Sequence, residues 1–277
     1  MPARLEGMRI VTTAVYLPGP LAAHRLHALG AQVHKIEPPG GDPMQAASPD
    51  WYAALAGGQQ VQRLDLKVAD DRSTLDGLLA EADLLLTSSR LKALRNLGLD
   101  RDAVGARHPQ LCQVAIIGHP QPDEDRPGHD LTYQARLDLL TPPQMPRTLI
   151  ADIAGAQEAV SSALGLLLAR ERGQGAGYEE VSLERAAAPF ADPWRYGATR
   201  PEGFLGGTTP SYGIYRAARG WVAIAGLEPH FAAGLQRALS LPELTREALE
   251  TAIAGRDAAA WEAWAEAHDL PIVALPD

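Results

Sequence analysis

The sequence predicts an α/β protein with a Rossmann-like large domain, built on a parallel sheet, and a smaller α+β domain. Strand-like and helical segments alternate from the N-terminus to residue 187. The first of them form a strand–helix–strand unit within residues 8–37, and such units produce parallel sheets. After Glu184 the composition changes, because the sequence becomes rich in Pro, Gly and aromatic residues. We therefore expect a large domain at 1–187, an extended linker at 188–210 and a small domain at 211–277.

Composition excludes several classes of partner. The 277 residues carry a net charge of −9 and no basic run longer than a pair, which argues against nucleic acid or an anionic membrane surface as the main partner. Cys112 is the only cysteine, so neither an internal disulfide nor a cysteine-based zinc site is expected, and we expect no metal. The N-terminus lacks a signal-peptide core and no apolar run is long enough to span a membrane, which predicts a cytoplasmic protein.

The opening unit begins with an apolar, β-branched strand over Met8–Ala14. Pro18, Gly19 and Pro20 then end the strand and start a helix over Leu21–Leu29, and a second strand covers Ala31–Glu37. The first turn has no GxGxxG pattern, which argues against an ordinary dinucleotide site.

Two further strands are expected, at residues 82–89 and 108–118, with a helix at 73–82 before the first of them. The four strands and their helices make the Rossmann-like domain. Arg90 and Arg95 follow the third strand, at the sheet edge where ligands bind in open α/β folds. Two arginines there can grip a phosphate, although solvated surface charge is the more common explanation.

The segment from Arg126 to Glu184 carries the candidate chemistry. A helix is expected from Asp152 to Gly173, so Asp152 lies at or just before a helix N-terminus, where free N–H groups can hold a developing oxyanion. His129 follows the turn-forming Pro127 and Gly128. A histidine and a carboxylate in one cleft are sufficient to move a proton on and off carbon. The simpler alternatives are that Asp152 is only an N-cap and His129 only a turn residue.

The small domain is predicted to start with a two-stranded hairpin over residues 211–226, turning at Arg219 and Gly220. Three helices follow, at Pro229–Leu239, Thr245–Ala254 and Asp257–His268. Trp261 and Trp264, three residues apart on the last helix, are interpreted as core residues.

The motifs, taken in order, resemble CoA-transferase family III, and most closely its α-methylacyl-CoA racemase branch. The resemblance covers essentially the whole chain. It is carried by LEGMRIV, GPLAAHRLHALGAQVHKIEPPGGDP, LDLK, ADLLLTSSR, RPGHDLTYQA, LIADIAGAQEAVSSALGLLLARERGQGAGYEEVSLERA and GGTTPSYGIYRAARGWVAIAGLEPHF. It implies the family's architecture, an interlocked homodimer in which each subunit is a ring threaded through the other.

The resemblance also implies roles for individual residues. Asp152 matches the family's catalytic aspartate, His129 the second acid/base of the racemases, and Glu228 a glutamate that reaches the site from the partner subunit. The residues expected on the CoA side are Arg90, Arg95, Tyr16, Pro18 and Gln59. Gln59 and Pro38 stand where the family carries basic residues, the loop before His129 is acidic rather than Gly-rich, and the chain ends short of the family's usual length. These departures imply weaker CoA binding or a shifted substrate.

The sequence is therefore compatible with three functions. The first is racemisation at the α-carbon of a 2-methylacyl-CoA, with Asp152 and His129 as two bases and backbone N–H groups at the helix start holding the enolate. The second is transfer of CoA between carboxylic acids, with Asp152 as nucleophile. The third is a homologue that binds CoA or a partner subunit without turnover. In the first two, CoA is part of the acyl-CoA substrate and no tightly bound cofactor is expected.

Overall fold

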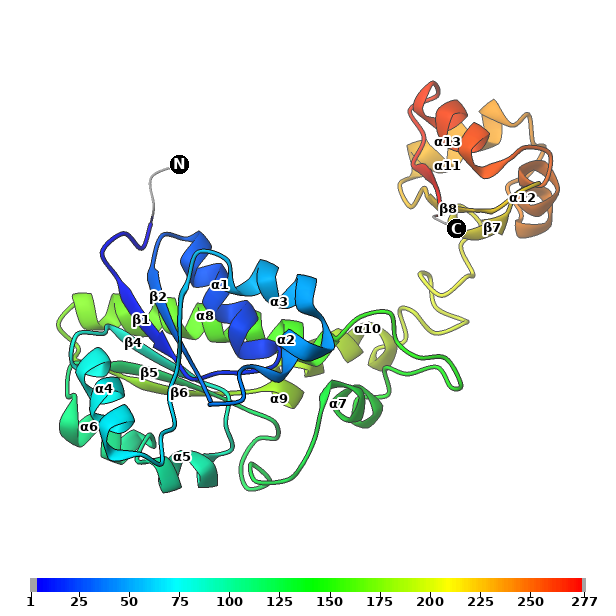
Figure 1. The fold of residues 1–277 in the computed structure, drawn as a ribbon. Coiled ribbons are helices and arrows are strands. Elements are labelled where there is room, and N and C mark those ends of the chain that lie inside the picture. The colour runs from blue at the N-terminus through cyan, green and yellow to red at the C-terminus, as the bar shows by residue number, and fades with distance from the viewer. Residues whose placement is uncertain (1–3, 276–277) are drawn as a thin grey trace. The chain divides into compact units, whose positions relative to one another are not determined.

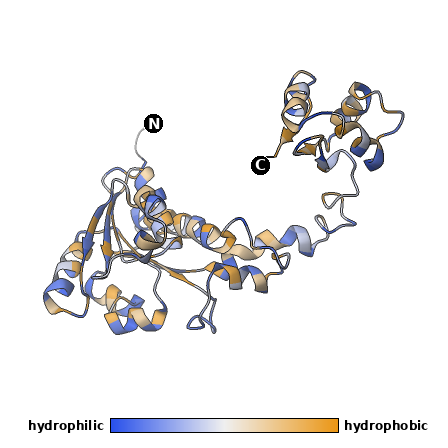
Figure 2. Ribbon diagram, turned by 45° about the vertical axis from the view of Figure 1, so that its right-hand side comes forward, coloured by the Kyte–Doolittle hydropathy of each residue, from blue (hydrophilic) through white to orange (hydrophobic). Residues whose placement is uncertain are grey.

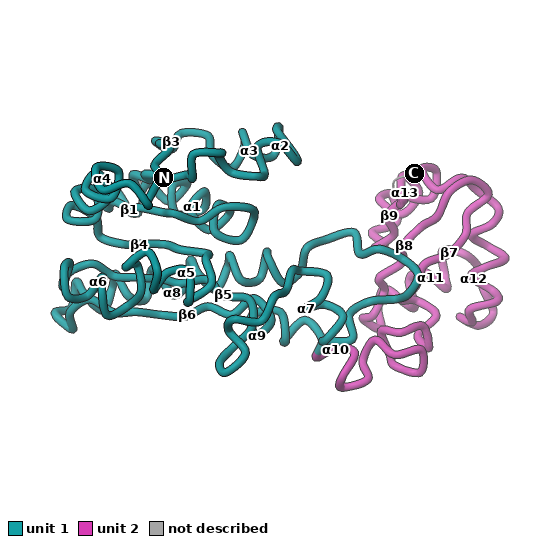
Figure 3. The backbone as a smooth tube through the Cα atoms, turned by 60° about the horizontal axis from the view of Figure 1, so that its bottom comes forward, with its two compact units in different colours: residues 1–191 teal, residues 192–277 magenta. Residues whose placement is uncertain are grey.

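The computed structural model describes residues 4–275, which divide into two compact units, unit 1 up to Ala191 and unit 2 from Asp192 (Figure 3). Unit 1 holds a six-stranded, fully parallel sheet. Its strands are β1 (Arg9–Thr12), β2 (Gln32–Glu37), β3 (Gln60–Arg63), β4 (Leu84–Thr87), β5 (Cys112–Ile117) and β6 (Tyr178–Ser182). Their order is β3-β2-β1-β4-β5-β6, the order of Rossmann folds, so the α/β prediction is confirmed.

The prediction of four strands was wrong, because β3 and β6 were missed. Both are edge strands and neither reads as a buried run. All four residues of β3 (QVQR) are exposed, and β6 (YEEVS) carries two glutamates. An edge strand pairs on one side only and needs no continuous apolar sequence.

Two helical layers cover the sheet (Figure 1). Helices α1 (Pro18–Ala28) and α8 (Ile150–Glu171) pack on one face, against Ile10, Val114 and their neighbours. Helices α4 (Ala69–Ala80), α5 (Leu91–Leu97) and α6 (Arg101–Arg107) pack on the other face. Alternate strand residues serve the two layers, as the period of two requires. Most helices carry both hydrophilic and hydrophobic residues, as Figure 2 shows, which is the pattern of a helix that buries one face.

The remaining helices of unit 1 are short. They are α2 (Pro43–Ala47), α3 (Pro49–Ala56), α7 (Asp130–Arg136), α9 (Leu183–Ala187) and the 3₁₀ turn η1 (Ala188–Ala191). Cys112 is fully buried in β5, where it is a small residue of the core. No helix within residues 4–275 is both long and apolar enough to cross a bilayer.

Unit 2 begins with α10 (Asp192–Arg195) and has its own core. The predicted hairpin is formed by β7 (Tyr212–Arg216) and β8 (Trp221–Ala225), but a third strand, β9 (Ile272–Ala274), extends it antiparallel to β8. The three predicted helices are α11 (Pro229–Ala238), α12 (Arg246–Ile253) and α13 (Ala258–Glu266). Trp261 is 2% exposed and meets the Trp264 ring edge-on at 5.1 Å, which confirms the core interpretation.

Candidate active site

A cavity of about 240 Å³ lies at the carboxyl ends of β1, β4 and β5. The strand order reverses between β1 and β4, and ligands of open α/β sheets bind at such a point. The cavity is lined by Val15, Tyr16, Pro18, Ser88, Arg90, Ile116, Ile117, Gly118, Glu124, Arg126, Gly128, His129, Tyr133, Asp152 and Leu183. Five residues predicted from the sequence are thus brought together: Tyr16, Pro18, Arg90, His129 and Asp152.

Asp152 lies in the first turn of α8, as its third residue. The expectation that it precedes or begins the helix was wrong by two residues, and the N-cap position is held by Leu149. Burial, and then the negative charge of Asp130, raise the pKa of Asp152 to about 7. A carboxyl group with that pKa is present in both protonation states at neutral pH, as an acid/base group requires.

Asp130 controls the start of α8. Its carboxylate is 4% exposed and accepts hydrogen bonds from the backbone N–H groups of Ala151 (2.7 Å) and Asp152 (3.1 Å), as well as from Gln134 Nε2. A carboxylate from α7 therefore caps α8 in place of a residue of the helix itself. The expectation that these N–H groups hold an enolate is accordingly wrong for Ala151 and Asp152, because Asp130 already occupies both.

His129 is the N-cap residue of α7 and is exposed to solvent at the cavity. Its backbone N–H donates to Thr132 Oγ1 at 3.1 Å, which fixes the turn. Its ring meets the Tyr16 ring edge-on, with centroids 6.4 Å apart. Asp130 follows His129 directly. The same short segment therefore carries one candidate base, His129, and caps α8, the helix that carries the other candidate base, Asp152.

Tyr16 has a strained backbone, with φ of 67°. Left-handed geometry in a tyrosine is uncommon and persists only where surrounding contacts hold it. Here the Tyr16 N–H donates to Asp42 Oδ1 at 3.0 Å. Asp42 in turn pairs with Lys35, whose Nζ lies 2.7 Å from both Asp42 Oδ2 and Glu37 Oε1. This buried triad of Lys35, Glu37 and Asp42 thus fixes the turn that carries Tyr16 to the cavity.

Sequence reasoning missed a second polar group beside the cavity. His119 is 2% exposed and its Nδ1 contacts Glu184, which also pairs with Arg136 at 3.0 Å. The His119 ring meets the Tyr133 ring edge-on at 5.0 Å. Tyr133 lies within the RPGHDLTYQA motif, but no local spacing indicates that its side chain points to the cavity.

Three other predicted residues do not line this cavity. Arg95 lies in the last turn of α5, exposed, 3.5 Å from the carboxylate of Asp125. Gln59 precedes β3, and its Nε2 donates to the Leu55 carbonyl at 2.6 Å. Glu228 belongs to unit 2, where it is the exposed N-cap residue of α11.

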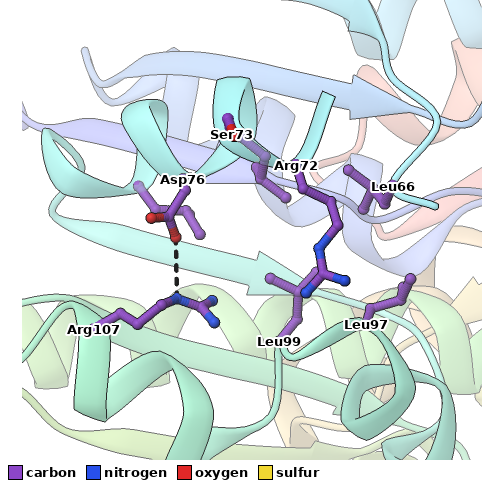
Figure 4. A pocket seen from close by; sticks show the side chains of 9 residues that line it. Leu66, Arg72, Ser73, Asp76, Leu97, Leu99 and Arg107 are labelled. Carbon is purple, nitrogen blue, oxygen red and sulfur yellow. Dashed lines mark ion pairs between the residues drawn. The ribbon is translucent and has the colours of Figure 1, made fainter. Parts of the chain in front are cut away.

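Besides a cavity of about 400 Å³ next to Tyr178, two more cavities lie in unit 1. One, of about 380 Å³, follows the carboxyl edge over β2 and β3, shares Val15 with the first cavity and is lined by Lys67 and Ser89. The other, of about 230 Å³, is lined by leucines of α4, α5 and the adjoining loops, with Arg107 Nε 3.0 Å from Asp76 Oδ1 at its wall (Figure 4). None of the residues predicted for the site lines the last cavity.

Comparison with known proteins identifies the family to which the chain is similar. The model described as CoA-transferase family III matches residues 5–275. The chain is 28% identical to human alpha-methylacyl-CoA racemase over 257 residues, covering 86% of this chain and 65% of the racemase. It is 27% identical to succinyl-CoA–D-citramalate CoA-transferase of Chloroflexus aurantiacus, covering 89% of this chain and 67% of that protein. The chain thus spans about two thirds of the length of these two relatives.

A solved structure agrees over nearly the whole chain. The crystal structure of Rv3272 from Mycobacterium tuberculosis superposes with a TM-score of 0.84 at 25% identity, covering 98% of this chain and 84% of that one. This similarity confirms the predicted fold.

Proposed function

Since the chain belongs to CoA-transferase family III, we propose that it moves a proton on and off the α-carbon of an acyl-CoA thioester, with Asp152 and His129 as its two acid/base groups. The observation that carries the proposal is their position in one cavity, at the switch point of the sheet. If one group removes the α-proton from one face and the other returns a proton to the opposite face, the centre is inverted. A 2-methylacyl-CoA is the substrate that the racemase resemblance favours.

The pKa of Asp152 supports acid/base chemistry. A thioester makes its α-proton acidic enough for a side-chain base, provided that the oxygen is stabilised as charge develops. Burial raises the pKa of Asp152 to about 7, so at neutral pH the carboxyl can serve as base in one direction and as acid in the other. A nucleophilic carboxylate, by contrast, has to be ionised.

CoA enters this proposal as part of the substrate and not as a bound cofactor. Tyr16, Pro18 and Arg90 line the reaction cavity, which supports their assignment to the thioester end of the substrate. The neighbouring cavity along the same edge supports a path for the rest of CoA, past Lys67. The roles of Arg95 and Gln59 remain predictions, as does the cytoplasmic location.

The homodimer is likewise part of the proposal. The family resemblance assigns Glu228 to the site of a partner subunit, and its carboxylate is exposed in unit 2 and makes no capping bond in α11. Glu228→Gln is expected to lower turnover without altering the dimer, and sedimentation velocity with kinetics on the same sample measures both.

CoA transfer is the second candidate, favoured by the relatives that are named as CoA-transferases. In that reaction Asp152 attacks the thioester carbonyl, CoA leaves as thiolate and an acyl-aspartyl anhydride forms. Hydroxylamine would then convert the Asp152 side chain into a hydroxamate, which peptide mass spectrometry detects.

The experiment that tests the proposal starts from one epimer of a 2-methylacyl-CoA. The wild-type protein is expected to yield both epimers, and Asp152→Asn and His129→Ala are each expected to stop the conversion. Chiral chromatography of the hydrolysed acids measures the ratio. An epimer that stays pure with the wild-type protein, while CoA appears on an added carboxylate, would refute the proposal in favour of transfer.

A further inference from the structure

The proposed reaction needs a hydrogen-bond donor for the thioester oxygen. When the α-proton leaves, negative charge develops on that oxygen, and a donor placed there in advance lowers the barrier. The first-turn N–H groups of Ala151 and Asp152 are not available, because Asp130 accepts from both, at 2.7 and 3.1 Å. The donor has to come from another group that lines the cavity.

The Tyr133 hydroxyl is such a group. Tyr133 lies in the middle of α7, is 2% exposed and lines the cavity that holds Asp152 and His129. Within residues 4–275, its hydroxyl makes no hydrogen bond. The ring is buried but the hydroxyl itself is open to the cavity, so an oxygen atom that enters the cavity can accept its hydrogen bond.

Two glycines of the cavity wall leave room for this hydroxyl. A Cβ atom at Gly118, directly after β5, would overlap Tyr133 Oη, and a Cβ at Gly128 would lie 2.8 Å from it. The Tyr133 ring also packs edge-on against the ring of His119, with the ring centroids 5.0 Å apart. A rigid ring with its hydroxyl at the cavity wall is oriented before the substrate arrives, which is the condition for electrostatic stabilisation.

The hydroxyl also keeps its proton. Burial, and then the negative charge of Asp152, raise the pKa of Tyr133 to about 12. The phenol is therefore neutral at any pH at which Asp152 titrates, and it donates a hydrogen bond without giving up the proton.

Building on the proposed function, we propose that Tyr133 is a catalytic residue that donates a hydrogen bond to the thioester oxygen while the α-proton is absent. The α C–H bond breaks, its proton goes to Asp152 or His129, and its electron pair moves into the C=C bond of an enolate whose oxygen accepts from Tyr133 O–H. The other base then supplies the proton that forms the new C–H bond. No proton is taken from Tyr133 at any stage.

Tyr133→Phe tests this role, because it removes one oxygen and keeps the ring that packs against His119. We expect the rate constant for α-proton exchange to fall by about 10²–10³-fold, as for loss of one oxyanion donor, with little change in KM. The matched control is Tyr178→Phe, whose hydroxyl donates to Glu180 at 2.9 Å and does not line this cavity. That variant is expected to exchange at the wild-type rate.

A CoA thioether, which has no carbonyl oxygen, separates catalysis from structure. Wild-type and Tyr133→Phe proteins are expected to bind it with equal affinity in calorimetry. A Tyr133→Phe protein that exchanges as fast as wild type would overturn the role of Tyr133 alone, and so would an equal loss of thioether affinity and exchange, which would indicate damage to the fold. A wild-type protein that exchanges no α-proton would overturn the proposed function, and the role of Tyr133 with it.

Discussion

At Asp152, burial and the carboxylate of Asp130 both oppose ionisation, and together they raise its pKa to about 7. The price is paid in folding free energy, since the protein holds the carboxyl group in an environment that disfavours its charged form. Because the folded state binds the proton more tightly than the unfolded state, stability falls as the pH rises from about 4 to about 7 and is level above that range.

Asp152→Asn should therefore stabilise the protein at high pH. An amide carries no charge, so the variant is expected to be more stable than wild type by about 2–4 kcal/mol at pH 8. At pH 4 the wild-type carboxyl is protonated in the folded state and the difference should shrink toward zero. Urea unfolding of both proteins at the two pH values measures it, and a difference independent of pH would contradict the assigned pKa.

Asp130→Asn isolates the contribution of the neighbouring charge. The amide oxygen can still accept the N–H groups of Ala151 and Asp152, but the negative charge is gone. We expect the pKa of Asp152 to fall, because its second cause is removed while burial remains. Carbon-13 NMR titration of the aspartate carboxyl carbons follows this shift, and an unchanged Asp152 titration would show that Asp130 acts only as a helix cap.

Much of the site was predictable at this scale, for a physical reason. Arg90 follows a strand, so its sequence position alone brings it to the ligand-binding edge of the parallel sheet, whereas Tyr16 was assigned from the family resemblance and His129 from its place after a turn. Asp130 and Tyr133 were missed because their roles depend on contacts with residues remote in sequence. The bond from Ala151 to Asp130 joins residues 21 positions apart, and no local pattern encodes it.

Among the elements, the central strands were predictable and the edges were not. A central strand such as β4 is buried on both faces and reads as an apolar run, whereas β3 has four exposed residues. Helix α8 was predicted nearly to its ends, because its buried alanines and leucines recur at helical spacing over 22 residues.

The turn after β1 depends on the buried triad of Lys35, Glu37 and Asp42. Each side chain is at most 1% exposed, so removal of Lys35 leaves two buried carboxylates without their shared cation, and Arg63 remains nearby, 3.9 Å from Glu37 Oε2. Lys35→Met is expected to destabilise the protein by about 3–5 kcal/mol. The exposed Lys92→Met is the control, with a change within about 0.5 kcal/mol. Urea unfolding compares them, and equal stabilities would mean that the triad does not hold this turn.

At the scale of the whole molecule, the sequence is sufficient to assign the fold and the family, whereas the choice of activity depends on the chemistry of the site. The change in composition after Glu184 predicted a large and a small domain, and the chain divides into two compact units. Five of the eight predicted site residues line one cavity of unit 1. The same scaffold carries both racemases and CoA-transferases among the relatives of this chain, so fold alone does not choose between them. The choice rests on what Asp152 does to the α-carbon.

Proton NMR of a 2-methylacyl-CoA incubated with the wild-type protein in heavy water tests that point directly. We expect the α-proton signal to disappear and the α-methyl doublet to collapse, while the thioester remains intact. An α-proton signal that persists, in a sample where the same protein moves CoA to an added carboxylate, would contradict it and would assign Asp152 the part of a nucleophile.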